Sequence, residues 1–217
     1  SFEVLPGIDP NTKNSYKPLE GKLYETGIKY APSFLDGYIN LALFDLEQTN
    51  SLVSTGSGQQ TQAGEVTSQG IELEGSVQAT EALRLTAAYT YTDAKTNDTG
   101  NGDRQASLIP RHQASFWGNY KVQQGPVSGL EVGTGVRYIG SSVGIGAVNA
   151  DYTPIYGSAQ VPAQTVWDAM IGYDFAKNWR AQVNVNNLLN DTYVASCDYY
   201  CYYGEPRSIV GSVNYRW

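Results

Sequence analysis

The residues best suited to chemistry lie in one short segment, "YVASCDYYCYYGEP", residues 193–206. It contains both cysteines of the chain, Cys197 and Cys201, which are the only possible disulfide pair, and five of the seventeen tyrosines. A tyrosine ring offers a flat apolar face and a hydroxyl at a small cost in conformational entropy. We therefore predict an aromatic loop that a disulfide holds in a pre-organised shape. A bridge that only protects an exposed loop from proteolysis is the alternative.

Signals for catalysis are weak. His112 is the only histidine, whereas a catalytic triad or a zinc site needs further partners. Glu72, Glu74 and Asp168 are carboxylates on the polar faces of predicted strands, where such residues are ordinary. The segment "GTGVRYIGSSVGIG" is followed by no helix, so it does not predict a nucleotide-binding loop. We predict no catalytic residue, no metal site and no enzyme.

Composition excludes further classes. The net charge of -7 argues against a nucleic-acid surface, which needs a basic patch. No apolar run approaches the 18 or so residues of a transmembrane helix. The mean hydropathy of -0.36 is typical of a soluble protein, but barrel strands alternate and average out on such a scale. The chain begins "SFEVLPGIDP", without a signal peptide, and we expect it to start inside a longer protein.

The elements that must position the loop are strands, because apolar and polar residues alternate with period two. Residues 83–91, "LRLTAAYTY", put Leu83, Leu85 and Tyr89 on one face and Arg84 on the other. Nine segments are predicted as strands, and "SFEV" is expected to be the end of a tenth: 22–30, 37–47, 71–79, 83–91, 111–121, 130–138, 167–175, 181–187 and 209–217.

The connections alternate in length. Long loops at 5–21, 49–66, 96–110, 140–163 and 192–206 alternate with four short turns. This asymmetry is typical of a transmembrane barrel with short periplasmic turns and long extracellular loops. The strands are also close to the 9–11 residues that a tilted strand needs to cross a bilayer. A soluble core filled by the same side chains is the alternative, and it leaves the asymmetry unexplained.

Several segments resemble the barrel of TonB-dependent outer-membrane receptors. They are "YETGIKY", "GYINLALFDLEQTNSL", "GEVTSQGIELEGSVQAT", "LRLTAAYTYTDAK", "IPRHQASFWGNY", "GVRYIGSS" and "NVNNLLNDTYVASC", followed by a final "NYRW". Their order and spacing match over nearly the whole chain. Within this family the chain is most similar to ferrichrome-type receptors for ferric hydroxamate siderophores, because a cysteine pair and "YYGEPR" lie in the last extracellular loop.

The resemblance implies an all-β fold, an antiparallel transmembrane β-barrel meander. Residues 1–217 would be its C-terminal part, about 9–10 strands of a plugged barrel of about 22 strands, with the plug domain and the N-terminal strands outside this chain. It further implies a receptor of the outer membrane of a Gram-negative bacterium that binds a ferric siderophore and imports it with TonB-coupled energy. Tyr199, Tyr200, Tyr202 and Tyr203 would contact the siderophore beside the Cys197–Cys201 disulfide.

The expected partners follow from the same resemblance. They are the ferric siderophore, the TonB–ExbB–ExbD complex acting through the missing N-terminal part, and outer-membrane lipid and lipopolysaccharide, with no nucleic acid and a monomeric state. No cofactor is expected, and iron enters only within the siderophore. Two alternatives stay open: a TonB-dependent receptor for cobalamin, haem or a glycan, and a small complete barrel that acts as a porin or an enzyme. The single histidine argues against haem.

Overall fold

The chain folds into β-strands. The computed structural model describes residues 2–10, 12–54, 60–98, 102–148, 150, 154–198 and 200–217. Within these ranges no helix is long and apolar enough to cross a membrane. The strands are β1 (Phe2–Glu3), β2 (Leu19–Tyr30), β3 (Gly37–Ser54), β4 (Gln60–Gln78), β5 (Leu83–Asp98), β6 (Gly102–Gln105), β7 (His112–Lys121), β8 (Leu130–Ile139), β9 (Ser142–Val148), β10 (Pro154–Val161), β11 (Gln164–Ala176), β12 (Trp179–Asn186), β13 (Val194–Asp198), β14 (Tyr200–Tyr203) and β15 (Ser208–Tyr215).

One sheet forms a wall in which neighbours along the chain are neighbours in space. Its order is β1-β2-β3-β4-β5-β7-β8-β11-β12-β15, with β6 paired to β5. Every pairing along this path is antiparallel. The predicted meander is therefore confirmed, and β1 is the tenth strand that was expected at "SFEV".

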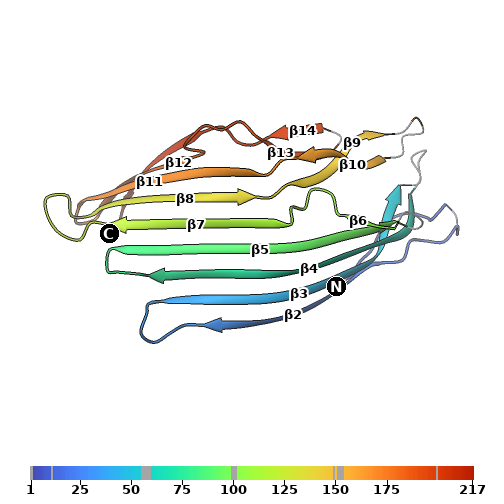
Figure 1. The fold of residues 1–217 in the computed structure, drawn as a ribbon, viewed down its shortest axis with the longest axis horizontal. Helices are drawn as coiled ribbons and strands as arrows, with labels where there is room; N and C mark the ends of the chain where they lie inside the picture. Colours follow the sequence, from blue (N-terminus) through green and yellow to red (C-terminus); the bar gives the residue numbers. More distant parts are fainter. Residues whose placement is uncertain are drawn as a thin grey trace.

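The two ends of the wall differ, as Figure 1 shows. Short turns join the strands at one end, the turn end, where the chain also finishes. The long connections lie at the other end, the loop end. Three of these connections contain paired strands: segment 96–110 contains β6, which pairs with β5, segment 140–163 contains the hairpin β9–β10, and segment 192–206 contains the hairpin β13–β14.

The prediction of plain loops at the loop end was thus wrong in part. Strand β3 continues to Ser54 and β4 begins at Gln60, well inside the expected loop 49–66. These extensions have polar residues on both faces, so the period-two signal ends before the pairing does. Main-chain groups still need partners, and continued pairing supplies them.

The register confirms the predicted faces. Ile171 of β11 lies between Val132 of β8 and Val183 of β12, so a row of aliphatic side chains crosses three strands. On this apolar face Ile171 is 49% exposed and Val213 is 63% exposed. A sheet face of this size that no part of the described chain covers indicates a non-aqueous surrounding.

The opposite, polar face carries paired charges. Near the turn end the Asp174 carboxylate accepts from Lys121 Nζ at 2.7 Å and from Arg180 at 3.2 Å, and Arg180 also binds Glu131 at 2.8 Å. Ion pairs of this kind satisfy charged groups that lipid would not tolerate. The structure therefore matches the expected division into a lipid-type face and a wet face.

Aromatic side chains gather toward both ends of the apolar face. At the turn end the rings of Trp179 and Tyr215 are 4.9 Å apart. Toward the loop end the Tyr89 hydroxyl lies 2.9 Å from His112 Nδ1, and the ring of Tyr91 lies 5.2 Å from that of His112. His112 begins β7 at the loop end, as predicted. Two such bands are typical of the interfaces of a membrane barrel.

Candidate functional site

The tyrosine hairpin, which we define as β13 and β14, projects from the loop end between β12 and β15. Cys197 and Cys201 are directly paired across it and form the predicted disulfide, with Cα atoms 4.0 Å apart. Asp198 pairs with Tyr200 beyond the bridge, and Ser196 pairs with Tyr202 on the near side. The bridge therefore closes the hairpin close to its tip.

The tyrosines of β14 are open to their surroundings. Tyr200 is 75% exposed, Tyr202 is 60% exposed and Tyr203 is 74% exposed. Side chains alternate along a strand, so Tyr200 and Tyr202 lie on one side of the hairpin and Tyr203 on the other. All three rings are therefore available for contact with a ligand. Tyr199, the other predicted ligand contact, lies outside the described residues.

The flank of the hairpin lies against the other extra hairpin. Strand β13 lies beside β9 and β10 (Figure 1), and Cys197 is 3% exposed in this contact, as is Val161 of β10. A Cβ added to Gly144 of β9 would collide with the carbonyl oxygen of Cys197. The main chains approach each other so closely that only glycine fits at position 144.

The base of the hairpin is fixed by Asn187, which is 2% exposed. Its Nδ2 donates to the carbonyl oxygens of Asp191 at 2.8 Å and Glu205 at 3.1 Å. Its Oδ1 accepts from the main-chain N–H of Asp191 at 2.9 Å. One amide thus joins the chain entering the hairpin to the chain leaving it. Asn187 has φ of 52°, a left-handed conformation that asparagine tolerates.

The same residue connects the hairpin to the wall. The main-chain N–H of Asn187 donates to Asp168 Oδ1 at 2.9 Å. Asp168, on the polar face of β11, also accepts from Arg137 Nε at 2.6 Å and from Nη2 at 3.0 Å. This two-pronged pair is the strong form of a charge-assisted hydrogen bond. We call Arg137, Asp168 and Asn187 the base network; Asp168 and Asn187 are buried, whereas the Arg137 side chain is 47% exposed.

The sequence analysis named the cysteines and tyrosines as candidates and missed the base network. Asp168 was predicted only as an ordinary carboxylate of the polar face. Asn187 lies in "NVNNLLND", the segment with the strongest family resemblance, and two of its residues, Asn187 and Asn190, have positive φ. A run of asparagines directly after a strand is a turn signal that would have located the base of the hairpin.

The site has the chemistry of a binding surface. Its exposed groups are phenol rings on a hairpin that is fixed at its tip, flank and base. Among the described residues, no group of three or more His, Cys, Asp or Glu side chains could hold a metal ion. Rigid aromatic faces with hydroxyls suit a preformed ligand with an apolar surface and oxygen atoms.

Comparison with known proteins places this geometry in a family. The profile described as "TonB dependent receptor-like, beta-barrel" matches residues 3–188. The chain belongs to the TonB-dependent receptor β-barrel family. The predicted resemblance and the predicted barrel fold are thereby confirmed.

Named relatives of this TonB-dependent barrel are receptors and transporters, in agreement with the prediction that it is not an enzyme. The ferrichrome outer membrane transporter/phage receptor of Escherichia coli K12 is 36% identical over 99% of this chain and 30% of its own length. The ferrioxamine B receptor of Salmonella typhimurium SL1344 is 36% identical over 93% of this chain and 29% of its own length. The chain therefore spans about 30% of the length of these relatives.

A solved structure agrees with the sequence matches. The ferric-catecholate import receptor Fiu of Escherichia coli K12 superposes with a TM-score of 0.74 at 27% identity, over 98% of this chain and 30% of that one. The wall, with its long connections at one end, is thus a portion of a TonB-dependent barrel.

Proposed function

We propose that residues 1–217 are the C-terminal part of an outer-membrane receptor that binds a ferric siderophore at its loop end and imports it with TonB-coupled energy. The loop end faces the cell exterior, the apolar face contacts lipid and the polar face borders the lumen. The plug domain and the first strands belong to the rest of the protein. Iron enters only as cargo within the siderophore.

The observation that carries the proposal is the set of exposed tyrosines on a fixed hairpin at the loop end. A ferric hydroxamate is a compact, neutral chelate with apolar flanks and an oxygen-rich surface. Aromatic faces contact the flanks, and phenol hydroxyls donate to the oxygens. The hairpin is already ordered, so binding loses little conformational entropy there. The ferrichrome and ferrioxamine B receptors among the relatives support a hydroxamate as the ligand.

A direct test uses the full-length receptor with Tyr200, Tyr202 and Tyr203 changed together to alanine. Burying one aromatic side chain contributes about 1.5–3 kcal/mol, and about 1.4 kcal/mol is a tenfold change in affinity. Removing three exposed rings should weaken binding of ferrichrome or ferrioxamine B at least tenfold, as measured by quenching of tryptophan fluorescence.

The control is Tyr173→Ala, which removes a ring that is 40% exposed from the apolar face of the wall. It should leave the affinity unchanged. Wild-type affinity in the triple variant would mean that the hairpin is only a shielded rim and that its disulfide is a structural clip.

Uptake of another metallophore is a second candidate function, because a metal–pseudopaline receptor of Pseudomonas aeruginosa is 35% identical over 98% of this chain. Titration with that class of ligand decides between the two.

A further inference from the structure

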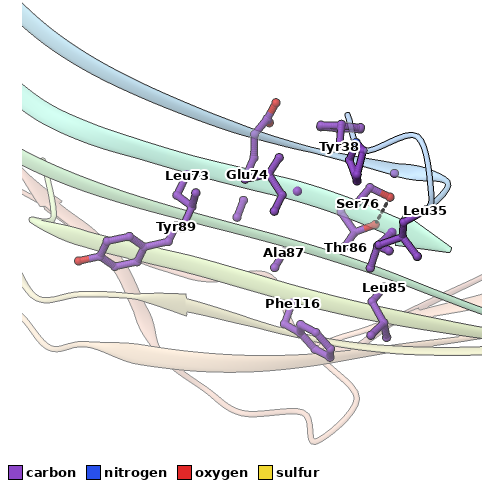
Figure 2. A pocket seen from close by; sticks show the side chains of 16 residues that line it. Leu35, Tyr38, Leu73, Glu74, Ser76, Leu85, Thr86, Ala87, Tyr89 and Phe116 are labelled. Carbon is purple, nitrogen blue, oxygen red and sulfur yellow. Dashed lines mark hydrogen bonds between the residues drawn. The ribbon is translucent and has the colours of Figure 1, made fainter. Parts of the chain in front are cut away.

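A hollow of about 530 Å³ opens on the apolar face, bounded by the β2–β3 turn and strands β3, β4, β5 and β7 (Figure 2). Gly75 and Ala87, which are paired between β4 and β5, form part of its lining and have almost no side chain. Figure 2 shows the larger side chains of Leu73, Leu85 and Phe116 around Ala87. The hollow therefore arises because small residues meet where the neighbouring positions carry large ones.

Water is a poor occupant of this hollow. The polar side chains of the same strands bond among themselves: Ser76 Oγ and Thr86 Oγ1 are 3.2 Å apart, and Glu74 accepts from Asn40 at 2.7 Å. Glu74, Ser76 and Thr86 also border the hollow, but strand alternation directs their side chains toward the polar face, where their polar atoms already have these partners. A water molecule in the hollow would meet hydrocarbon side chains and would lack the two to four polar partners that hold buried water in place.

Other parts of the receptor also leave the hollow uncovered. Further strands of a barrel extend the sheet at its edges, beside β1 and β15, and a plug lies against the polar face. The hollow is on the opposite face and lies between strands that are all present in this chain. Its surroundings are therefore the hydrocarbon of the bilayer.

We propose that the hollow binds one acyl chain of a phospholipid from the periplasmic leaflet. This inference rests on the proposed placement of the wall in the outer membrane. The hollow extends from the turn end, at Leu85, to Tyr89, a distance of four residues or about 13 Å along the strand. Because barrel strands tilt by about 40°, this corresponds to about 10 Å of depth, which lies within one leaflet of a hydrocarbon core of about 30 Å. Because the short turns are periplasmic, the leaflet is the one that contains phospholipid rather than lipopolysaccharide.

The physical gain is packing. Side chains around an empty hollow lack neighbours on one side and lose dispersion contacts, which a flexible acyl chain restores. Tyr89 borders the end of the hollow that is nearer the loop end, and its hydroxyl lies 2.9 Å from His112 Nδ1, which holds the side chain in place. The bound chain thus lies in a fixed groove, whereas lipid elsewhere on the wall contacts a more even surface.

The test is native mass spectrometry of the full-length receptor in mild detergent with added phosphatidylethanolamine. Wild type should retain one phospholipid per receptor. Ala87→Leu, which fills the hollow, should lower the retained fraction at least fivefold. Ala169→Leu, a matched change on the apolar face of β11 outside the hollow, should retain lipid as wild type does. If Ala87→Leu blocks assembly, Ala87→Val replaces it, with a smaller loss expected.

The outcomes separate this inference from the proposed function. Equal retention in both leucine variants, no retained lipid in wild type, a lipopolysaccharide mass, or a dimer without lipid would each overturn the acyl-chain site. Siderophore titration of the same samples should show wild-type affinity in Ala87→Leu. Failure of wild type to bind any siderophore while it retains phospholipid would count against the proposed function alone.

Discussion

Asn187→Ala tests whether the base network holds the tyrosine hairpin in place. The substitution removes three hydrogen bonds that link Asp191 and Glu205 at the base of the hairpin. Each contributes about 0.5–1.5 kcal/mol net. Alanine in a left-handed conformation costs about 1–2 kcal/mol more. Because Asp191 and Glu205 are themselves exposed, water replaces part of the loss, and we expect about 2–4 kcal/mol less stability for the docked hairpin.

Hydrogen–deuterium exchange of the full-length receptor measures this loss directly. At about 1.4 kcal/mol per factor of ten, hairpin opening should increase between about 30-fold and 700-fold. Peptides covering residues 188–207 should exchange faster, while peptides from β8 and β11 should not change, because the wall keeps its ladder. The control is Asn184→Ala on β12, the strand that ends just before Asn187; the Asn184 side chain accepts from Gln182 and does not reach the hairpin.

Two results would refute this reasoning. Unchanged exchange in 188–207 would show that the disulfide and the contact with β9 hold the hairpin without Asn187. Equal acceleration in β8 and β11 would show that the asparagine supports the wall as a whole and not the docking of the hairpin.

Three further predictions concern the same end of the molecule and the wall. Gly144→Ala should speed exchange in the tyrosine hairpin because its Cβ collides with the Cys197 carbonyl, whereas Gly211→Ala, which meets no atom within 4 Å, should not; equal behaviour would contradict the close approach. Cys197→Ser should weaken siderophore binding less than tenfold, because it loosens the hairpin tip and deletes no ring; a larger loss in titration would make the bridge itself part of the contact surface. Residues 1–217 expressed alone should not give a heat-modifiable monomer on gels, because the open sheet edges are unpaired; a folded monomer in detergent would favour a small complete barrel.

Much of the wall could be predicted from the sequence because one face repeats apolar residues at every second position. The segment 167–175 was predicted as a strand, and β11 runs over Gln164–Ala176. The segment 140–150 was predicted as a loop because it is a run of small residues between two predicted strands, yet β9 runs over Ser142–Val148. Beyond the apolar face, strands continue to pair through main-chain hydrogen bonds. Such pairing does not require apolar and polar residues to alternate, so the sequence does not reveal it.

The candidate site, like the wall, could be predicted only in part from the sequence. Cys197 and Cys201 were identified by residue type, because a chain with two cysteines allows only one bridge within it. Asn187 acts through main-chain oxygens of Asp191 and Glu205, and any residue type could supply a main-chain oxygen at those positions. The contact of Gly144 with Cys197 joins positions 53 residues apart and also involves main chain. Such contacts depend on how the loop-end hairpins fold together, which residue types do not specify.

The fixed position of the tyrosine hairpin predicts how strongly each substitution in it should lower the affinity for a ligand. The hairpin is fastened at its tip by the disulfide, at its flank by β9 and β10 and at its base by Asn187. An ordered loop has little entropy left to lose on binding, so its tyrosines contribute almost their full contact energy. Substitutions that remove a ring should therefore cost more affinity than Asn187→Ala, which loosens the base, and Asn187→Ala more than Cys197→Ser, which loosens only the tip. This order distinguishes direct contact from support, because a hairpin that only shields the pocket would give small and equal losses in all three.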